Sequence, residues 1–372
     1  METLIQILGE NGTLAAGALV IGIAFGFLAQ RSRFCMRSAV IEFSRNHTGG
    51  KLTVWLFAFG AAVAGTQALA WAGWIDVGNA RQIAARGSLS GAAVGGSLFG
   101  IGMILARGCA SRLLVLLAHG NLRALLSVLI FTVTAQSALT GALSPLRLAI
   151  SEWWTIDGGA ARDLIARSGI GHGGALAFGA AWLAAAAYWA RRQRVPVWGW
   201  AGAIGVGLSI AAAWWFTYAV STVAFDVHPI QALTFTGPMA EALTRALFVT
   251  DKPINFDLGL MAGVFLGAFI ASALYRELTL EGFQGGASMR RYIVGAALMG
   301  FGGMLAGGCA VGAGLSGAAV FTATAFVALL AMWLAGALTD HLLDEHPTGA
   351  LDHPLPGAAN AIEQGAMAKA QA

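Results

Sequence analysis

Long stretches without charged residues follow one another along most of the chain. A helix that crosses a bilayer needs about 20 consecutive, predominantly apolar residues. The stretch 292–339 is too long for one span and contains several glycines, so we expect two spans there. The sequence thus predicts an all-α integral membrane protein with nine transmembrane helices: 11–30, 52–75, 88–106, 124–143, 172–190, 198–225, 258–275 and two within 292–339.

Four other apolar stretches are too short or too interrupted to cross a bilayer. They cover 113–118, 151–170, 229–249 and 310–315. Short apolar segments at membrane depth form re-entrant or interfacial helices, and irregular backbone there must be buried in protein or line a cavity. We therefore expect short re-entrant hydrophobic helices between the spans, in the places where transporters hold their substrates.

The composition excludes several classes of protein. Of 372 residues, 57% are hydrophobic and only 11% are charged, whereas about a quarter of the residues in a typical soluble domain are charged. This excludes a soluble enzyme, a disordered scaffold and a nucleic-acid-binding protein, and makes membrane lipid the expected surroundings. The chain has no P-loop, so we expect no ATP-driven step within it.

Basic residues indicate the orientation in the membrane. They gather in the loops after the first, third, fifth and seventh expected spans, for example at Arg45, Arg123, Arg192 and Arg290. The positive-inside rule then places the N-terminus outside and the C-terminus in the cytoplasm of a cell (inner) membrane protein. We expect one transport domain over 1–345 and a poorly ordered cytoplasmic tail over 346–372.

Two segments repeat in register. Adding 200 to the positions of seven residues gives seven identities without a gap, from Gly100–Ala110 to Gly300–Ala310, and the repeat includes Cys109 and Cys309. The first copy follows the third span and the second follows the eighth, so the two copies should be inverted. An inverted pseudo-two-fold repeat, with half-repeats 12–143 and 172–340, is typical of transporters that carry substrate between the halves.

The repeated Gly-Cys-Ala turns suggest an anion site. Gly108 and Gly308 permit a sharp turn, and each following cysteine then lies at the N-terminus of a short helix, where free N–H groups favour anions. The competing interpretation is that Cys109 and Cys309 are buried packing residues. The role of Arg107 is also undecided from the sequence: it could attract an anion, or it could be an ordinary basic residue of a cytoplasmic loop.

The third cysteine has a different context, and the cysteines together exclude some chemistry. Cys35 lies in Arg-Phe-Cys-Met-Arg, without a glycine turn, so a role in substrate binding and a role in packing are equally open. Three cysteines without a CxxC pair or zinc-finger spacing give no closed disulfide framework and no metal site. We expect no cofactor.

The GxxxG-like spacings predict close contacts between helices. They occur at Gly22/Gly26, Gly96/Gly100 and Gly263/Gly267. Small residues spaced in this way let two helix backbones approach each other within a membrane.

With these motifs the chain resembles the YeeE/YedE family of sulfur-transport membrane proteins. The resemblance is carried by Gly26-Phe27 with Arg33-Phe34-Cys35, by 102–110 and by 302–312, and it covers nearly the whole chain. It implies an hourglass-like helical fold and thiosulfate or a related sulfur anion as substrate. It also implies a central path lined by Cys35, Cys109 and Cys309, which pass the anion on through S–H hydrogen bonds. A TusA-like cytoplasmic sulfur-carrier protein is the partner that the resemblance implies.

Three functions remain open from the sequence. The first, a non-enzymatic transporter for a small sulfur oxyanion, is coherent because thiols and helix termini can both receive an anion. The second is a membrane thiol enzyme, either a sulfurtransferase or a quinone-linked oxidoreductase, which would need a persulfide or mixed-disulfide intermediate. The third is a structural subunit with packing cysteines. Transport of a selenium compound is a variant of the first.

Overall fold

The computed structural model describes residues 2–45, 49–247, 253–282 and 286–343. The expected tail, 346–372, lies outside these residues. Within them the elements are α1 (Glu2–Ser32), α2 (Met36–Ser44), α3 (Gly50–Trp71), α4 (Arg81–Ala84), β1 (Gly87–Ser88), α5 (Leu89–Leu105), α6 (Ala110–Ala118), α7 (Leu122–Thr140), α8 (Ser144–Glu152), β2 (Thr155–Ile156), η1 (Gly159–Ala161), α9 (Leu164–Ser168), α10 (Gly171–Arg192), α11 (Val197–Ser221), α12 (Thr236–Leu247), α13 (Phe256–Leu274), α14 (Gly286–Leu305), η2 (Ala310–Ser316), α15 (Gly317–Ala319) and α16 (Ala323–Leu343).

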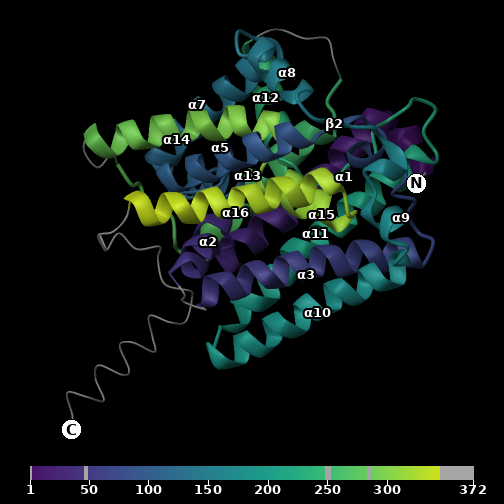
Figure 1. Cartoon of the computed structure of the whole chain (residues 1–372), viewed down its shortest axis with the longest axis horizontal. Coiled ribbons are helices and arrows are strands. Elements are labelled where there is room, and N and C mark those ends of the chain that lie inside the picture. Colours follow the sequence, from purple (N-terminus) through teal and green to yellow (C-terminus); the bar gives the residue numbers. More distant parts are fainter. Residues whose placement is uncertain (1, 46–48, 248–252, 283–285, 344–372) are drawn as a thin grey trace.

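Nine helical stretches in the described residues are long and apolar enough to cross a membrane, which confirms the predicted number. Figure 1 shows the axes of α3, α5, α10, α14 and α16 roughly aligned across the view, as expected of a bundle of spans. The predicted limits are less accurate than the number. For example, α3 ends at Trp71 rather than at residue 75 because a turn at Ala72 and Gly73 follows it.

The short apolar segments form separate short elements. The segment 113–118 belongs to α6, and 310–315 belongs to η2, a π-helix that leads into α15. The region 151–170 contains β2, η1 and α9, and β2 pairs antiparallel with β1 through Gly87↔Ile156 and Ser88↔Thr155. Thus each of α1, α5 and α14 is followed by a turn and then by a short helix.

The predicted glycine contacts between helices are confirmed. A Cβ on Gly22 would lie 2.7 Å from the carbonyl oxygen of Leu260, so only glycine permits the approach of α1 to α13. Gly259 lies against Ala15 and Gly267 against Ile23, so residue numbers increase together and the two helices run parallel. Because they run parallel, α1 and α13 end at the same side of the bundle.

The helices that carry the Gly-Cys repeat run in opposite directions. Gly95 of α5 lies against Gly302 of α14, and Gly102 lies against Gly295, so residue numbers increase on one helix as they decrease on the other. The matched segments are therefore locally antiparallel, and the turns after α5 and α14 lie at opposite ends of the bundle. An inverted repeat over the two whole halves stays a prediction.

Candidate functional site

All three cysteines follow the same type of turn. In a Schellman motif, one residue beyond a helix takes the left-handed conformation, and two N–H groups bond back to carbonyls of the last turn. The left-handed residue lies two positions before each cysteine: it is Arg33 (φ 55°) before Cys35, Arg107 (φ 55°) before Cys109, and Gly307 (φ 80°) before Cys309.

The hydrogen bonds of the three turns correspond. The N–H of Phe34 donates to Ala29 over 3.2 Å, and the N–H of Gly108 donates to Met103 over 3.1 Å. In the third turn, the N–H of Gly308 donates to the carbonyl of Gly303 at 2.8 Å. The sequence suggested that Cys35 lacks this turn because it lacks glycine. The structure corrects that interpretation, since an arginine can take the left-handed conformation at the end of α1.

Each cysteine is also the N-terminal capping residue of the short helix that follows it. The carbonyl of Cys109 accepts the N–H of Leu113 at 2.9 Å, and that of Cys309 accepts the N–H of Ala313 at 2.8 Å. Helix N-termini present free N–H groups and a partial positive charge. Every thiol therefore lies at the end of a helix that favours an anion.

The structure brings Cys35 and Cys109 together. Their side chains interact directly, and all three cysteines are free thiols. Cys109 is also 3.5 Å from the hydroxyl of Ser111. Both cysteines follow helices that end at the same side of the bundle, which we call the two-thiol end. Both are buried, with exposed fractions of 7% for Cys35 and 0% for Cys109.

Cys309 lies at the opposite end, the single-thiol end. It is 1% exposed, and its Sγ accepts the N–H of Gly312 at 3.5 Å. The segment before α12 covers it: the backbone of Phe235 interacts with the thiol, and Ser316 donates to the carbonyl of Leu233 at 2.7 Å. Thr236 is 1% exposed, and its hydroxyl has no hydrogen-bond partner among the described residues. Backbone groups of Gly312 and Phe235 therefore supply the polar contacts of this thiol.

The predicted glycines occupy these turns, and their surroundings differ. A Cβ on Gly308 would lie 2.6 Å from the backbone nitrogen of Ala313, so η2 leaves no room for a side chain there. A Cβ on Gly108 would meet side chains rather than backbone, namely Leu113 at 3.1 Å and Arg112 at 3.9 Å. Arg107, the remaining predicted site residue, is partly buried within the turn before Cys109. Its contact with a substrate stays a prediction.

A cluster of arginines at the two-thiol end was missed from the sequence. Arg31 and Arg33 belong to the basic stretch after the first expected span, and they are only 4% and 9% exposed. Both pair with Glu277, which follows α13, and Arg112 of α6 joins them through Gln30. Residues 31 and 277 are too far apart in sequence for spacing to reveal the contact; the signal was a basic run at the end of an apolar helix.

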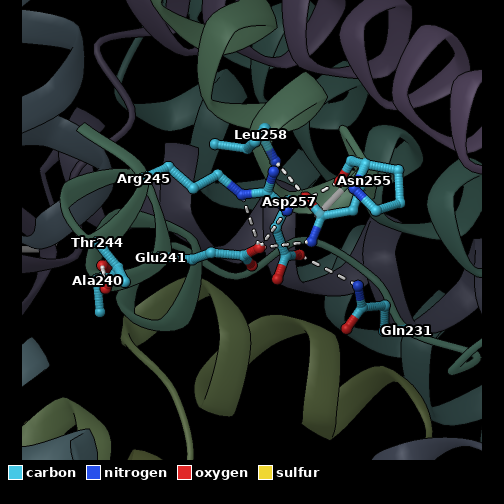
Figure 2. Close-up of polar contacts among 9 residues, drawn as sticks. Gln231, Ala240, Glu241, Thr244, Arg245, Asn255, Asp257 and Leu258 are labelled. Carbon is cyan, nitrogen blue, oxygen red and sulfur yellow. Dashed lines mark hydrogen bonds and ion pairs between the residues drawn. The ribbon is translucent and has the colours of Figure 1, made fainter. Parts of the chain in front are cut away.

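A different polar cluster lies at the start of α13, at the single-thiol end. Figure 2 shows Glu241 of α12 accepting hydrogen bonds from Arg245 at 3.0 Å and from Asn255 at 2.8 Å. Beside it Asp257 accepts a hydrogen bond from Gln231 at 3.1 Å. Gln231 belongs to the segment that leads to Phe235, and the backbone of Phe235 interacts with the Cys309 thiol. These contacts hold that segment in place over the thiol.

Comparison with known proteins gives the family. Residues 31–339 match the family described as "Sulphur transport". The chain is 25% identical over 356 residues to a protein of Escherichia coli (strain K12) named thiosulfate transporter TsuA, covering 87% of this chain and 92% of that protein. It is 27% identical over 314 residues to a protein of the same name from Spirochaeta thermophila (strain ATCC 700085 / DSM 6578 / Z-1203), covering 80% of this chain and 90% of that protein. With a match over most of its length and nine candidate spans in the described residues, this multi-pass membrane chain belongs to the sulphur-transport (YeeE/YedE) family.

Proposed function

We propose that this protein takes up thiosulfate through a path that passes Cys309 at one end of the bundle and Cys109 and Cys35 at the other. The thiols pass the anion along by S–H hydrogen bonds, while the helix N-termini beside them offset its charge. The observation that carries the proposal is the same turn found three times, with a buried free thiol capping a short helix each time.

The physical chemistry suits a sulfur oxyanion. A divalent anion is very costly to bury without partners. The terminal sulfur of thiosulfate is a soft acceptor for weak S–H donors, and its oxygens accept the stronger N–H and O–H donors. The two relatives named as thiosulfate transporters support the same substrate. Gly108 and Gly308 lie between the left-handed residue and the thiol in their turns, and we include both in the path.

The orientation follows from the positive-inside rule. The two-thiol end then faces the cytoplasm and the single-thiol end faces outward, with the N-terminus outside and the C-terminus inside. A TusA-like sulfur carrier remains the proposed cytoplasmic partner.

Uptake of sulfur-labelled thiosulfate tests the proposal in cells that lack their own transporters. We expect uptake by the wild-type protein that excess sulfate does not suppress, retained in part by Cys309→Ser. Serine keeps a donor but is a poorer match for sulfur, so an S–H relay is weakened rather than stopped. A matched control is Ser209→Ala in α11. It removes a buried hydroxyl that donates to the carbonyl of Gly205 within the same helix.

No thiosulfate uptake at matched membrane levels would contradict the proposal. Suppression of labelled uptake by excess selenite would show that the path also accepts a selenium oxyanion.

A further inference from the structure

Five polar side chains meet beside the two-thiol end, and we call them the arginine cluster: Gln30, Arg31, Arg33, Arg112 and Glu277. Glu277 is the centre of the cluster. Its Oε1 accepts from Arg31 at 3.3 Å and from Arg33 at 3.1 Å, and its Oε2 accepts from Gln30 at 2.8 Å. Arg112 donates to the other side of Gln30, at 3.3 Å.

The cluster has more positive than negative charge. The cluster contains three guanidinium groups and one carboxylate, although a buried cation is costly unless it is paired. The Nε atoms of Arg31 and Arg33 are buried and have no hydrogen-bond partner among the described residues. Arg31 is held in addition by the ring of Tyr275, 3.4 Å from its guanidinium carbon. These guanidinium groups therefore retain capacity for a further anion.

The neighbouring histidine does not supply extra charge at neutral pH. Burial, and then the nearby charge of Arg33, lower the pKa of His119 below its ordinary value. Its ring bonds to Ser272 and approaches Thr279, with Glu277, Arg112 and Glu281 as the other charged groups that act on it. The excess charge of the cluster thus belongs to the arginines.

Both thiols of the two-thiol end are close in sequence to members of this cluster. Arg33 lies two residues before Cys35, and Arg112 lies three residues after Cys109. Glu277 differs from Arg31 and Arg33 because its side chain is 19% exposed, whereas theirs are 4% and 9% exposed. An anion that leaves the thiol pair therefore meets guanidinium groups whose present partner can move toward water.

We propose that the arginine cluster is a second binding site for the transported divalent sulfur oxyanion, and that Glu277 is a resident carboxylate that the anion displaces. The site rests on the proposed function, since it receives the anion from Cys35 and Cys109. Charge-assisted, two-pronged bonds from Arg31 and Arg33 hold the oxygens of the anion. The return of Glu277 then releases it, which keeps binding weak enough for passage.

Binding to the purified full-length protein tests this directly, with labelled thiosulfate as the probe. Glu277→Gln removes the competing charge, so we expect thiosulfate to bind about tenfold more tightly. Glu277→Asp keeps the charge on a shorter side chain and should give a smaller gain. Arg33→Gln should weaken binding about tenfold. Because the two changes have opposite signs, misfolding cannot produce both.

Asp340→Asn is the matched control. Asp340 is another buried carboxylate that pairs with an arginine, Arg45, at 2.8 Å, and it lies outside the cluster. We expect the Asp340→Asn variant to bind thiosulfate as tightly as the wild-type protein does. Uptake measured beside binding should fall for Glu277→Gln at saturating thiosulfate, because release is slower.

The outcomes separate this inference from the proposed function. Unchanged or weaker thiosulfate binding by Glu277→Gln, in a protein whose uptake still depends on the cysteines, would overturn the second site alone. An equal gain in Asp340→Asn would overturn it too, because the effect would then be one of overall charge. Absence of both binding and uptake in the wild-type protein would overturn both proposals.

Discussion

The two ends of the bundle hold their thiols in the same turn but surround them differently. At the single-thiol end, Cys309 interacts with the N–H of Gly312 and the backbone of Phe235. The next residue, Thr236, has a buried hydroxyl without a hydrogen-bond partner among the described residues. At the two-thiol end, Cys35 and Cys109 interact with each other beside the arginine cluster. The neutral donors of one end suit brief contact with an anion, whereas the guanidinium groups of the other suit holding it. On the proposed path, the anion should therefore be held longer at the two-thiol end than at the single-thiol end.

The turns themselves differ in how much they depend on glycine. We expect Gly308→Ala to destabilise the protein by about 1–3 kcal/mol, because the new Cβ would press on the backbone nitrogen of Ala313. We expect Gly108→Ala to cost less than about 1 kcal/mol, since the flexible end of the Leu113 side chain can shift. Thermal unfolding of the purified variants measures both. Equal losses of stability would show that the closer approach of Ala313 to Gly308 does not make that turn more dependent on glycine.

Charge should matter at one end and not at the other. We expect Arg33→Gln to lower thiosulfate uptake about tenfold, because it removes a guanidinium group that would receive the anion. Thr236→Val, which removes one buried hydroxyl, should lower it only about threefold. The initial uptake rate at low thiosulfate concentration gives both values. The reverse order would contradict the assignment of the holding site to the two-thiol end.

Arg107 tests whether the turn or its side chain matters. Glycine takes the left-handed conformation without strain, so Arg107→Gly should preserve the turn before Cys109. We expect uptake within about threefold of the wild-type rate, since the arginines paired to Glu277 supply the charge. A loss of more than tenfold in a stable, membrane-inserted variant would instead assign substrate contact to Arg107.

The smallest expected effect is a pH dependence. The pKa of His119 is lowered by burial and by Arg33, so the unfolded chain takes up this proton at a higher pH than the folded protein does. Stability from the neutral ring is present above about pH 6.5 and is lost as the pH falls below it. His119→Gln should therefore lose less thermal stability between pH 7.5 and 5.5 than the wild-type protein. An identical loss would assign the acid sensitivity to other groups.

The spans and the repeated Gly-Cys turns could be predicted from the sequence because both leave local signals. Hydropathy gives the number of spans, and seven identities at a spacing of 200 give the turns at Cys109 and Cys309. The ends of the helices were less accurate, since local turns such as that at Gly73 decide them.

The turn at Cys35 and the arginine cluster could not be predicted in this way. Arg33 takes a backbone conformation that its residue type does not favour, so no glycine marks the turn. The contact between Arg31 and Glu277 joins residues 246 positions apart, and it exists only because α1 and α13 lie parallel through their glycines. Such contacts depend on packing, which spacing along the chain does not encode.

On the proposed path, the anion must pass thiols at both ends of the bundle in series. The most direct test is the uptake of labelled thiosulfate by Cys109→Ala, by Cys309→Ala and by the double variant, at matched membrane levels. The uptake rate of each single variant should fall at least about tenfold, and that of the double variant should fall little further, because one blocked step stops the path. Uptake that survives either single substitution would contradict it.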